Sequence, residues 1–134
     1  MKLPFLIALL VCVYSESALE ATIGESCEKN PNYVINSFVV TPWPLIRTQQ
    51  YNIFISGVFI EKEYVKQLYF ATRFKRGFWH YTYQSVYVEY EKGSQANFTI
   101  SIQAPSEKGP YTDQVSLHRH DFSKIACWQY DYDL

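Results

Sequence analysis

The last part of the chain, residues 109–134, places the strongest constraint on its fold. Two sets of residues alternate over residues 111–118, which is the two-residue period of a β-strand. The odd positions hold Tyr111, Asp113, Val115 and Leu117, and the even positions hold Thr112, Gln114, Ser116 and His118. Residues 119–123 are polar enough to form a turn, and residues 124–132 alternate again with Cys127 in the middle of the run. The pattern predicts a terminal hairpin, and the cysteine in its second strand needs a partner.

The beginning of the chain is typical of a secretory signal peptide. Lys2 precedes an apolar run over residues 3–14, and small residues follow at Ser15, Ser17 and Ala18. The run is short for a membrane span, although an uncleaved anchor is the alternative. We therefore expect a signal peptide over residues 1–17 and one mature domain over residues 18–134. A cut after Ser15 or Ala18 fits the pattern equally well.

The cysteine count predicts one disulfide. Each of the three cuts removes Cys12, which leaves only Cys27 and Cys127. An even pair in an oxidising compartment favours a disulfide bond. In the chain-entropy model, closing a loop of about 100 residues stabilises the fold by at most about 4.7 kcal/mol.

The rest of the mature chain consists of strand-like runs separated by turn residues. The runs cover residues 33–41, 51–60, 65–75, 78–90 and 97–103. Pro42 and Pro44 end the first run because each removes a backbone donor, and Gly57 marks a bulge or a close approach. With the hairpin, these runs make about seven or eight antiparallel strands, which is typical of an all-β sandwich. Residues 61–69 also fit a single helical turn.

The inward positions of these runs carry large apolar side chains. Such side chains either fill an ordinary close-packed core or line a slot between two sheets that holds a hydrophobic ligand. Composition alone does not decide between these interpretations. The inward set is Phe38, Val40, Ile53, Ile55, Phe59, Leu68, Phe70, Phe74, Val86, Val88, Phe98, Ile100, Ile102, Val115 and Leu117.

Several short motifs occur in a recognisable order. Cys27 follows the signal peptide, a strand ends in Pro42-Trp43-Pro44, and an aromatic-aliphatic strand follows at residues 50–55. Later come Gly109-Pro110-Tyr111 and then Ile125-Ala126-Cys127-Trp128. This arrangement resembles the ML (MD-two-related lipid-recognition) domain family, which includes the Niemann-Pick type C cholesterol carrier, the ganglioside activator protein and the group-two mite allergens.

The resemblance implies an immunoglobulin-like β-sandwich of two antiparallel sheets with a hydrophobic cavity between them. It implies a monomeric, secreted or endolysosomal protein that binds or transfers a sterol, a phospholipid or a glycolipid, with no enzymatic activity and no cofactor. The inward set without Val40 would line the lipid slot. The family usually carries further disulfides, but Trp43 stands where a cysteine is often found, and residues 75–92 lack the usual Cys-Pro pair. A secreted interaction module with a filled core is the alternative.

Other chemistry is weakly indicated. The net charge of −1 gives no basic excess for nucleic acid, and no nucleophile or phosphate-loop motif of an enzyme is present. His118, His120 and Asp121 suggest part of a metal site, but a solvated strand end is the favoured interpretation because a site needs three or four ligands.

Two surface features remain. Asn97-Phe98-Thr99 is a glycosylation sequon whose Asn97 falls in the outward phase of its strand. Arg73, Lys75 and Arg76 precede Phe78 and Trp79, a pattern that fits a transient contact with an anionic membrane. A solvated turn is the favoured interpretation of this basic cluster.

Overall fold

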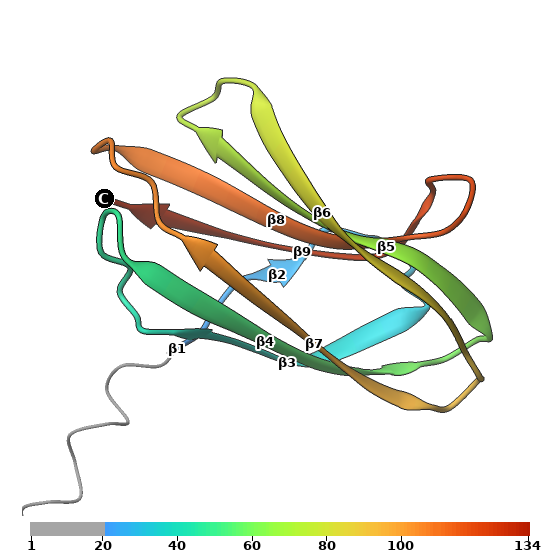
Figure 1. The fold of residues 1–134 in the computed structure, drawn as a ribbon. Coiled ribbons are helices and arrows are strands. Elements are labelled where there is room, and N and C mark those ends of the chain that lie inside the picture. The colour runs from blue at the N-terminus through green and yellow to red at the C-terminus, as the bar shows by residue number, and fades with distance from the viewer. Residues whose placement is uncertain (1–20) are drawn as a thin grey trace, which may run out of the picture.

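The computed structural model describes residues 21–134, which form two antiparallel sheets, one above the other in Figure 1. The predicted signal peptide, residues 1–17, lies outside the described residues. The first sheet has the order β1-β3-β4-β7, with bounds Ala21–Thr22, Tyr33–Thr41, Gln50–Phe59 and Gln95–Gln103. The second sheet has the order β2-β9-β8-β5-β6, with bounds Glu25–Ser26, Lys124–Asp133, Pro110–His118, Glu63–Phe74 and Trp79–Tyr90.

Apolar alternation sets the face that each strand turns inward. In β4, Tyr51, Ile53, Ile55 and Phe59 are all buried, whereas the side chains between them reach the outer face or, at Gly57, are absent. Fully burying one such side chain stabilises by about 1.5–3 kcal/mol, so a register slip by one residue would lose several of these contributions at once. The predicted inward phase of this strand is confirmed.

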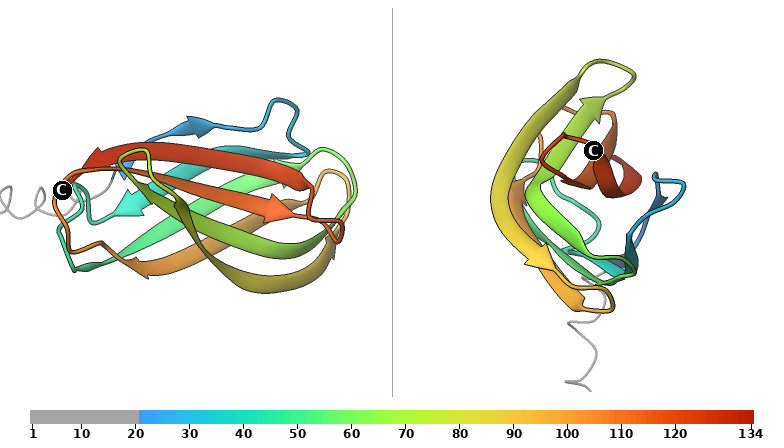
Figure 2. Two further views of the ribbon diagram at one scale, coloured as in Figure 1. Left: turned by 90° about the horizontal axis from the view of Figure 1, so that it is seen from above. Right: turned by 90° about the vertical axis from the view of Figure 1, so that its right-hand side faces the viewer.

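The inward rows of neighbouring strands lie in register, so the core is built in cross-strand rungs. Phe38 pairs with Ile55, which pairs with Phe98 in the first sheet. Leu68 and Leu117 form the corresponding rung in the second sheet. Side chains of both rungs, Ile55 and Phe98 from one sheet and Leu68 and Leu117 from the other, surround one small void and belong to one buried cluster. Figure 2 shows the two sheets from the end of the sandwich.

Gly57 lies at a close approach, as the sequence predicted. A Cβ on Gly57 would come within 2.7 Å of the Tyr33 ring and 2.4 Å of the Val34 carbonyl oxygen. The pairing of β3 with β4 shifts between Ile35 and Ser37, directly beside this glycine. The missing side chain lets Tyr33 lie against β4 and donate its hydroxyl to the Ala96 carbonyl at 2.8 Å.

The predicted disulfide is confirmed. Cys27 and Cys127 are bonded with their Cα atoms 4.9 Å apart, and the Cys27 N–H donates to the Cys127 carbonyl at 3.0 Å. The Trp128 indole donates to the Ile23 carbonyl at 2.9 Å, so the segment before β3 is fastened to β9 at more than one point.

The fold class is confirmed, with one local correction. Residues 61–69 form no helical turn, because β5 begins at Glu63 and runs to Phe74, hydrogen-bonded to β6 on one side and to β8 on the other. The run over residues 78–90, which is long enough for two strands or one bent strand, forms the single strand β6 from Trp79 to Tyr90, and its pairing with β5 shifts register between Val65 and Gln67. Within the part of the chain that the structure describes, no helix is long and apolar enough to cross a membrane.

Candidate functional site

The interior between the sheets collects most of the residues expected to line a lipid slot. Two members, Val86 and Ile102, are partly buried and pack against the core. The members buried in one cluster are Phe38, Ile53, Ile55, Phe59, Leu68, Phe70, Phe98, Ile100, Val115 and Leu117.

Two members of the expected set lie outside this cluster. Val88 is 41% exposed, because β6 is the edge strand of its sheet and extends beyond the cover of the other sheet. Phe74 is half-buried at the last position of β5, where its ring contacts Tyr111 with centroids 4.9 Å apart. Both stay in the inward rows, where Val88 pairs with Val65 and Phe74 with Tyr111, but neither is fully buried, since strand phase alone does not tell where a sheet stops being covered.

The interior is closely packed. One internal void of about 10 Å³ lies among Ile55, Leu68, Phe98 and Leu117, which is room for about one water molecule. Pockets that hold small molecules are usually roughly 300–1,000 Å³. The hydrophobic cavity expected between the sheets is therefore too small at this void to hold a lipid chain.

A surface crevice leads toward the void. It measures about 80 Å³, lies between β3 and β9 beside Pro31 and Trp128, and has a mostly apolar lining. Tyr33, Ile35 and Ala126 line both the crevice and the void. The crevice is thus a route from the surface to the interior that passes only a few side chains.

The opposite end of the interior is polar. Asp113 is fully buried in the inward row of β8 and accepts three tyrosine hydroxyls. Tyr51 and Tyr130 donate to Oδ2 at 3.0 and 2.8 Å, and Tyr132 donates to Oδ1 at 2.9 Å. Because Tyr51 comes from β4 and Asp113 from β8, one of these bonds joins the two sheets. We call these four residues the polar end.

Burial controls the ionisation of Asp113. The apolar surroundings raise the pKa of its carboxyl to about 6, although the tyrosine hydroxyls favour the ionised form. Within the described residues, no ion pair reaches this carboxylate. Asp113 is therefore a buried acid held by neutral donors, whose charge changes in the weakly acidic range.

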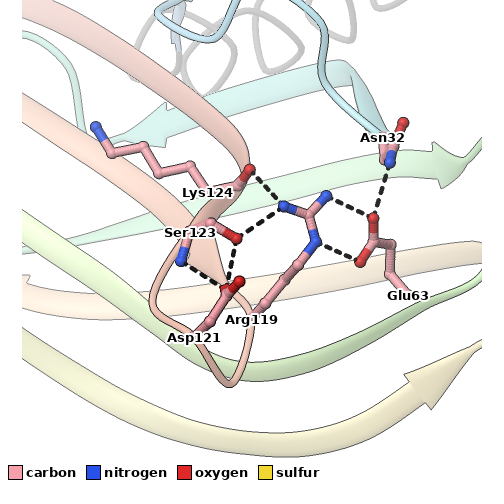
Figure 3. Close-up of polar contacts among 6 residues, drawn as sticks. All are labelled: Asn32, Glu63, Arg119, Asp121, Ser123 and Lys124. Atoms are coloured by element: carbon pink, nitrogen blue, oxygen red, sulfur yellow. Dashed lines mark hydrogen bonds and ion pairs between the residues drawn. The ribbon is translucent and has the colours of Figure 1, made fainter.

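The void end of the sandwich is fastened by an ion pair (Figure 3). Arg119 donates from Nε and Nη2 to the two carboxylate oxygens of Glu63 at 2.7 and 2.6 Å, and Asn32 donates to the same carboxylate at 2.8 Å. Arg119 also donates to the Ser123 hydroxyl and the Lys124 carbonyl. The hydrogen bonds from Arg119 lower the pKa of Glu63 below its ordinary value. Glu63, Arg119 and Asn32 form what we call the latch.

Sequence reasoning missed both of these polar groups. Asp113 stands in the inward phase between Tyr111 and Val115, and a carboxylate in an apolar row is a signal that it needs buried donors. The latch has no comparable signal. Glu63 and Arg119 are far apart in sequence, and only the pairing of β5 with β8 brings them together.

The histidines do not gather at one site. His118 is buried rather than solvated, with Nδ1 2.9 Å from the Phe122 carbonyl and Nε2 2.8 Å from the Ser116 hydroxyl. A carbonyl only accepts, so Nδ1 carries the proton, and burial lowers the pKa of the ring. His120 instead stacks on Tyr64, with centroids 4.5 Å apart. No group of three metal-ligating side chains occurs in residues 21–134.

The surface features keep their predicted positions. Asn97 is exposed in the outward row of β7, so its modification stays a prediction. In the basic cluster, Arg73 stacks on Trp79 at 4.7 Å and Lys75 lies over Phe74 at 5.0 Å. Phe78, at the turn that follows, is 89% exposed.

Comparison with known proteins supports the fold. No protein family model and no curated protein matches the chain. Among solved structures, a Niemann-Pick type C2 protein from Japanese carpenter ant superposes with a TM-score of 0.61 at 10% identity, covering 83% of this chain and 98% of that chain. The C-terminal domain of wzt superposes with a TM-score of 0.56 at 13% identity, covering 86% and 81%. Chicken MD-1 complexed with lipid IVa gives a TM-score of 0.48 at 15% identity, covering 81% and 95%.

The first of these structures confirms the ML-type β-sandwich that the sequence resemblance implied. Identities this low establish the arrangement of the strands and not the ligand.

Proposed function

We propose that this chain is a non-enzymatic lipid-binding protein that takes an acyl or sterol chain between its two sheets. The proposal rests on the mostly apolar crevice between β3 and β9, which shares Tyr33, Ile35 and Ala126 with the internal void. The fold shared with a Niemann-Pick type C2 protein and the resemblance to the ML family support the same function.

Binding requires the closed sandwich to open. The void of about 10 Å³ holds no lipid chain, so a ligand must displace side chains around Phe98, Leu68 and Leu117. Each methylene that leaves water supplies about 0.8 kcal/mol, so a long chain is the kind of ligand that offsets the repacking. The polar end stays hydrogen-bonded while the void end opens, which places the tail among the apolar rows. The polar groups at the surface opening of the crevice select among a sterol, a phospholipid and a glycolipid.

The test uses two matched overpacking variants. Ala126→Leu fills the crevice and the void, whereas Ala104→Leu adds the same atoms at an alanine that is buried but lines neither. Each insertion costs about 1–3 kcal/mol of stability. We expect Ala126→Leu to abolish uptake of a fluorescent phospholipid or sterol from vesicles while Ala104→Leu retains it. Native mass spectrometry of the mildly purified wild type should show a bound lipid.

The closed interior also favours a second candidate. A sandwich whose core is filled by its own side chains suits a secreted interaction module that works through its loops. A wild type that carries no lipid and takes none from vesicles, with both alanine variants equally destabilised, would support that module and contradict the lipid carrier.

We also propose that the mature chain begins after residue 17 and is a secreted or endolysosomal monomer glycosylated at Asn97. The disulfide between Cys27 and Cys127 fits an oxidising compartment. N-terminal sequencing of the secreted protein and its gel mobility before and after endoglycosidase treatment test the first and last points.

A further inference from the structure

The outer face of the five-stranded sheet carries a row of aromatic rings along β6. Trp79, Tyr81 and Tyr83 occupy successive outward positions of this edge strand, and Tyr81 and Tyr83 are 58% and 64% exposed. Tyr69 on β5 stacks against Tyr83 with centroids 5.8 Å apart and meets Tyr81 edge-on at 6.3 Å. We call these four residues the aromatic face.

The long edge strand of the first sheet, β7, has a different composition on its outer face. β7 is the edge of the four-stranded sheet, and its outward row consists of small polar residues such as Asn97, Thr99 and Ser101. Polar residues are the usual choice on a solvated sheet face. A contiguous exposed aromatic patch instead marks a binding surface.

Hydrogen-bonding side chains lie next to the aromatic face on the neighbouring strands. Gln114 on β8 donates to Gln129 on β9 at 3.0 Å, and Thr112 donates to Asp131 at 2.6 Å. Arg73, Thr112 and Asp131 occupy one cross-strand rung with Trp79. An open groove of about 760 Å³ borders this end of the face, beyond the four aromatic residues, and its charged lining consists of Arg73, Lys75, Arg76, Asp131 and Asp133.

Two polar atoms on this face lack partners. Among residues 21–134, the buried side-chain nitrogen and oxygen atoms without a hydrogen bond are Gln67 Oε1 and Arg73 Nε. Both residues belong to the outward row of β5, one on each side of Tyr69 and Ala71, and Gln67 is 8% exposed. A buried polar atom without a partner is costly, and these two, an acceptor and a donor, would gain partners from a ligand's hydroxyl groups if the two side chains turned toward the outer face.

We propose that the aromatic face and its groove bind an uncharged oligosaccharide. Sugar rings present apolar C–H faces that stack on aromatic rings and hydroxyl edges that both donate and accept hydrogen bonds, which matches aromatic rings flanked by amides, a hydroxyl and a guanidinium. Arg73 and Asp131 carry opposite charges on one rung, and the groove adds Lys75, Arg76 and Asp133, so its cationic and anionic side chains nearly balance. A lipid surface would offer no partners to the remaining hydrogen-bonding groups of Gln114 and Gln129. This site is separate from the interior and does not depend on lipid binding.

The experiment screens the whole secreted protein on an array of neutral and sulfated glycans, followed by calorimetric titration of the best neutral oligosaccharide. Tyr81→Ala and Tyr83→Ala should each weaken binding by about tenfold or more, as expected for the loss of one stacking ring. Phe54→Ala is the control, because Phe54 is 42% exposed on the outer face of the other sheet and should leave the affinity unchanged. Chemical shifts of the wild type should move at Tyr69, Gln114 and Gln129 on addition of the sugar.

Three outcomes would overturn the proposal. The first is an array on which no glycan is bound. The second is binding to sulfated glycans alone that disappears at high salt, which would assign the groove to Lys75 and Arg76 as an anion site. The third is an unchanged affinity in both tyrosine variants while their thermal stability matches the wild type.

Discussion

The polar end joins the two sheets through Tyr51, whereas the latch ties β5 to the turn after β8 and, through Asn32, to the segment before β3. The two groups hold a buried carboxylate by opposite electrostatic means. Asp113 lies fully buried among tyrosine hydroxyls without a cation, so its pKa is raised to about 6. Glu63 is almost as buried, but its carboxylate accepts two hydrogen bonds from Arg119 in a bidentate pair, and its pKa is lowered. Glu63 and Thr72, the β5 residue paired with Asp113, lie roughly 30 Å apart along the strand. The partner of a buried carboxylate, more than its burial, decides the direction in which its pKa moves.

Removing the buried acid should have the largest effect. In Asp113→Ala, three buried hydroxyls lose their shared acceptor and a small cavity forms, so we expect the unfolding free energy to fall by about 3–5 kcal/mol. Urea denaturation at pH 7 measures it. Asp131→Ala is the control, since that exposed carboxylate accepts only from Thr112 and should change stability little. Equal losses of unfolding free energy in the two variants would show that the buried carboxylate stabilises the fold no more than the exposed one.

The raised pKa of Asp113 predicts a pH dependence of about 3 kcal/mol. Between its ordinary pKa of 3.8 and about 6, the folded protein holds a proton that the unfolded chain has lost, so this contribution to stability is present at low pH and is lost as the pH rises through about 6. The variant Asp113→Asn has no carboxyl group that can ionise at this position. The stability of the wild type minus that of Asp113→Asn should therefore decrease from pH 4 to pH 7. A difference that stays constant would refute the raised pKa.

The latch should respond in the opposite direction and with a smaller effect. Glu63→Gln removes the charge that Arg119 pairs with, and we expect a loss of about 1–2 kcal/mol at pH 7. Because the pKa of Glu63 is lowered, this stabilisation is present above its ordinary pKa and is lost as the pH falls through the lowered value. Glu89→Gln, which breaks an exposed contact with Lys62, is the matched control. A Glu63→Gln deficit that grows on acidification would contradict this assignment.

The smallest expected effect distinguishes the hydrogen bond between the two sheets from a hydrogen bond within one sheet at the polar end. Tyr51→Phe and Tyr130→Phe each remove one hydroxyl from Asp113 Oδ2 and should each cost about 1 kcal/mol. Only Tyr51 belongs to the other sheet, so only Tyr51→Phe should raise amide exchange along β4 relative to its effect on global stability. Identical exchange patterns in the two variants would mean that the inter-sheet bond does not restrain the sandwich.

The sequence predicted the strands and their inward phase because alternation is local information. It identified the rows through Ile53, Ile100 and Val115, the terminal hairpin and the partner of Cys127. It failed at Val88 because cover by the other sheet depends on sheet order, which no single strand encodes. It failed at His118 because the outer face was assumed to be solvated, whereas Tyr69 packs on that ring at 4.2 Å.

The candidate site was predictable in composition and not in shape. The apolar lining follows from strand phase, so the residues around Phe98 and Leu117 were found. The closed state and the crevice depend on how two sheets fit together, which is a packing property of the whole core. The polar end could have been found from one residue, since an acid in an apolar row has to be paired.

The bond between Cys27 and Cys127 encloses nearly the whole sandwich in a covalent ring. A protease that cuts one peptide bond in any loop from β3 to β9, including the exposed turn at Phe78, would therefore release no fragment. Both pieces would stay joined through the sulfur atoms and through the strands that pair across the cut. Under non-reducing conditions such a nick would add only one water to the mass of the protein. Two bands would appear on a denaturing gel only after the disulfide is reduced. Release of a fragment after proteolysis therefore requires reduction of the disulfide as well as cleavage of the backbone.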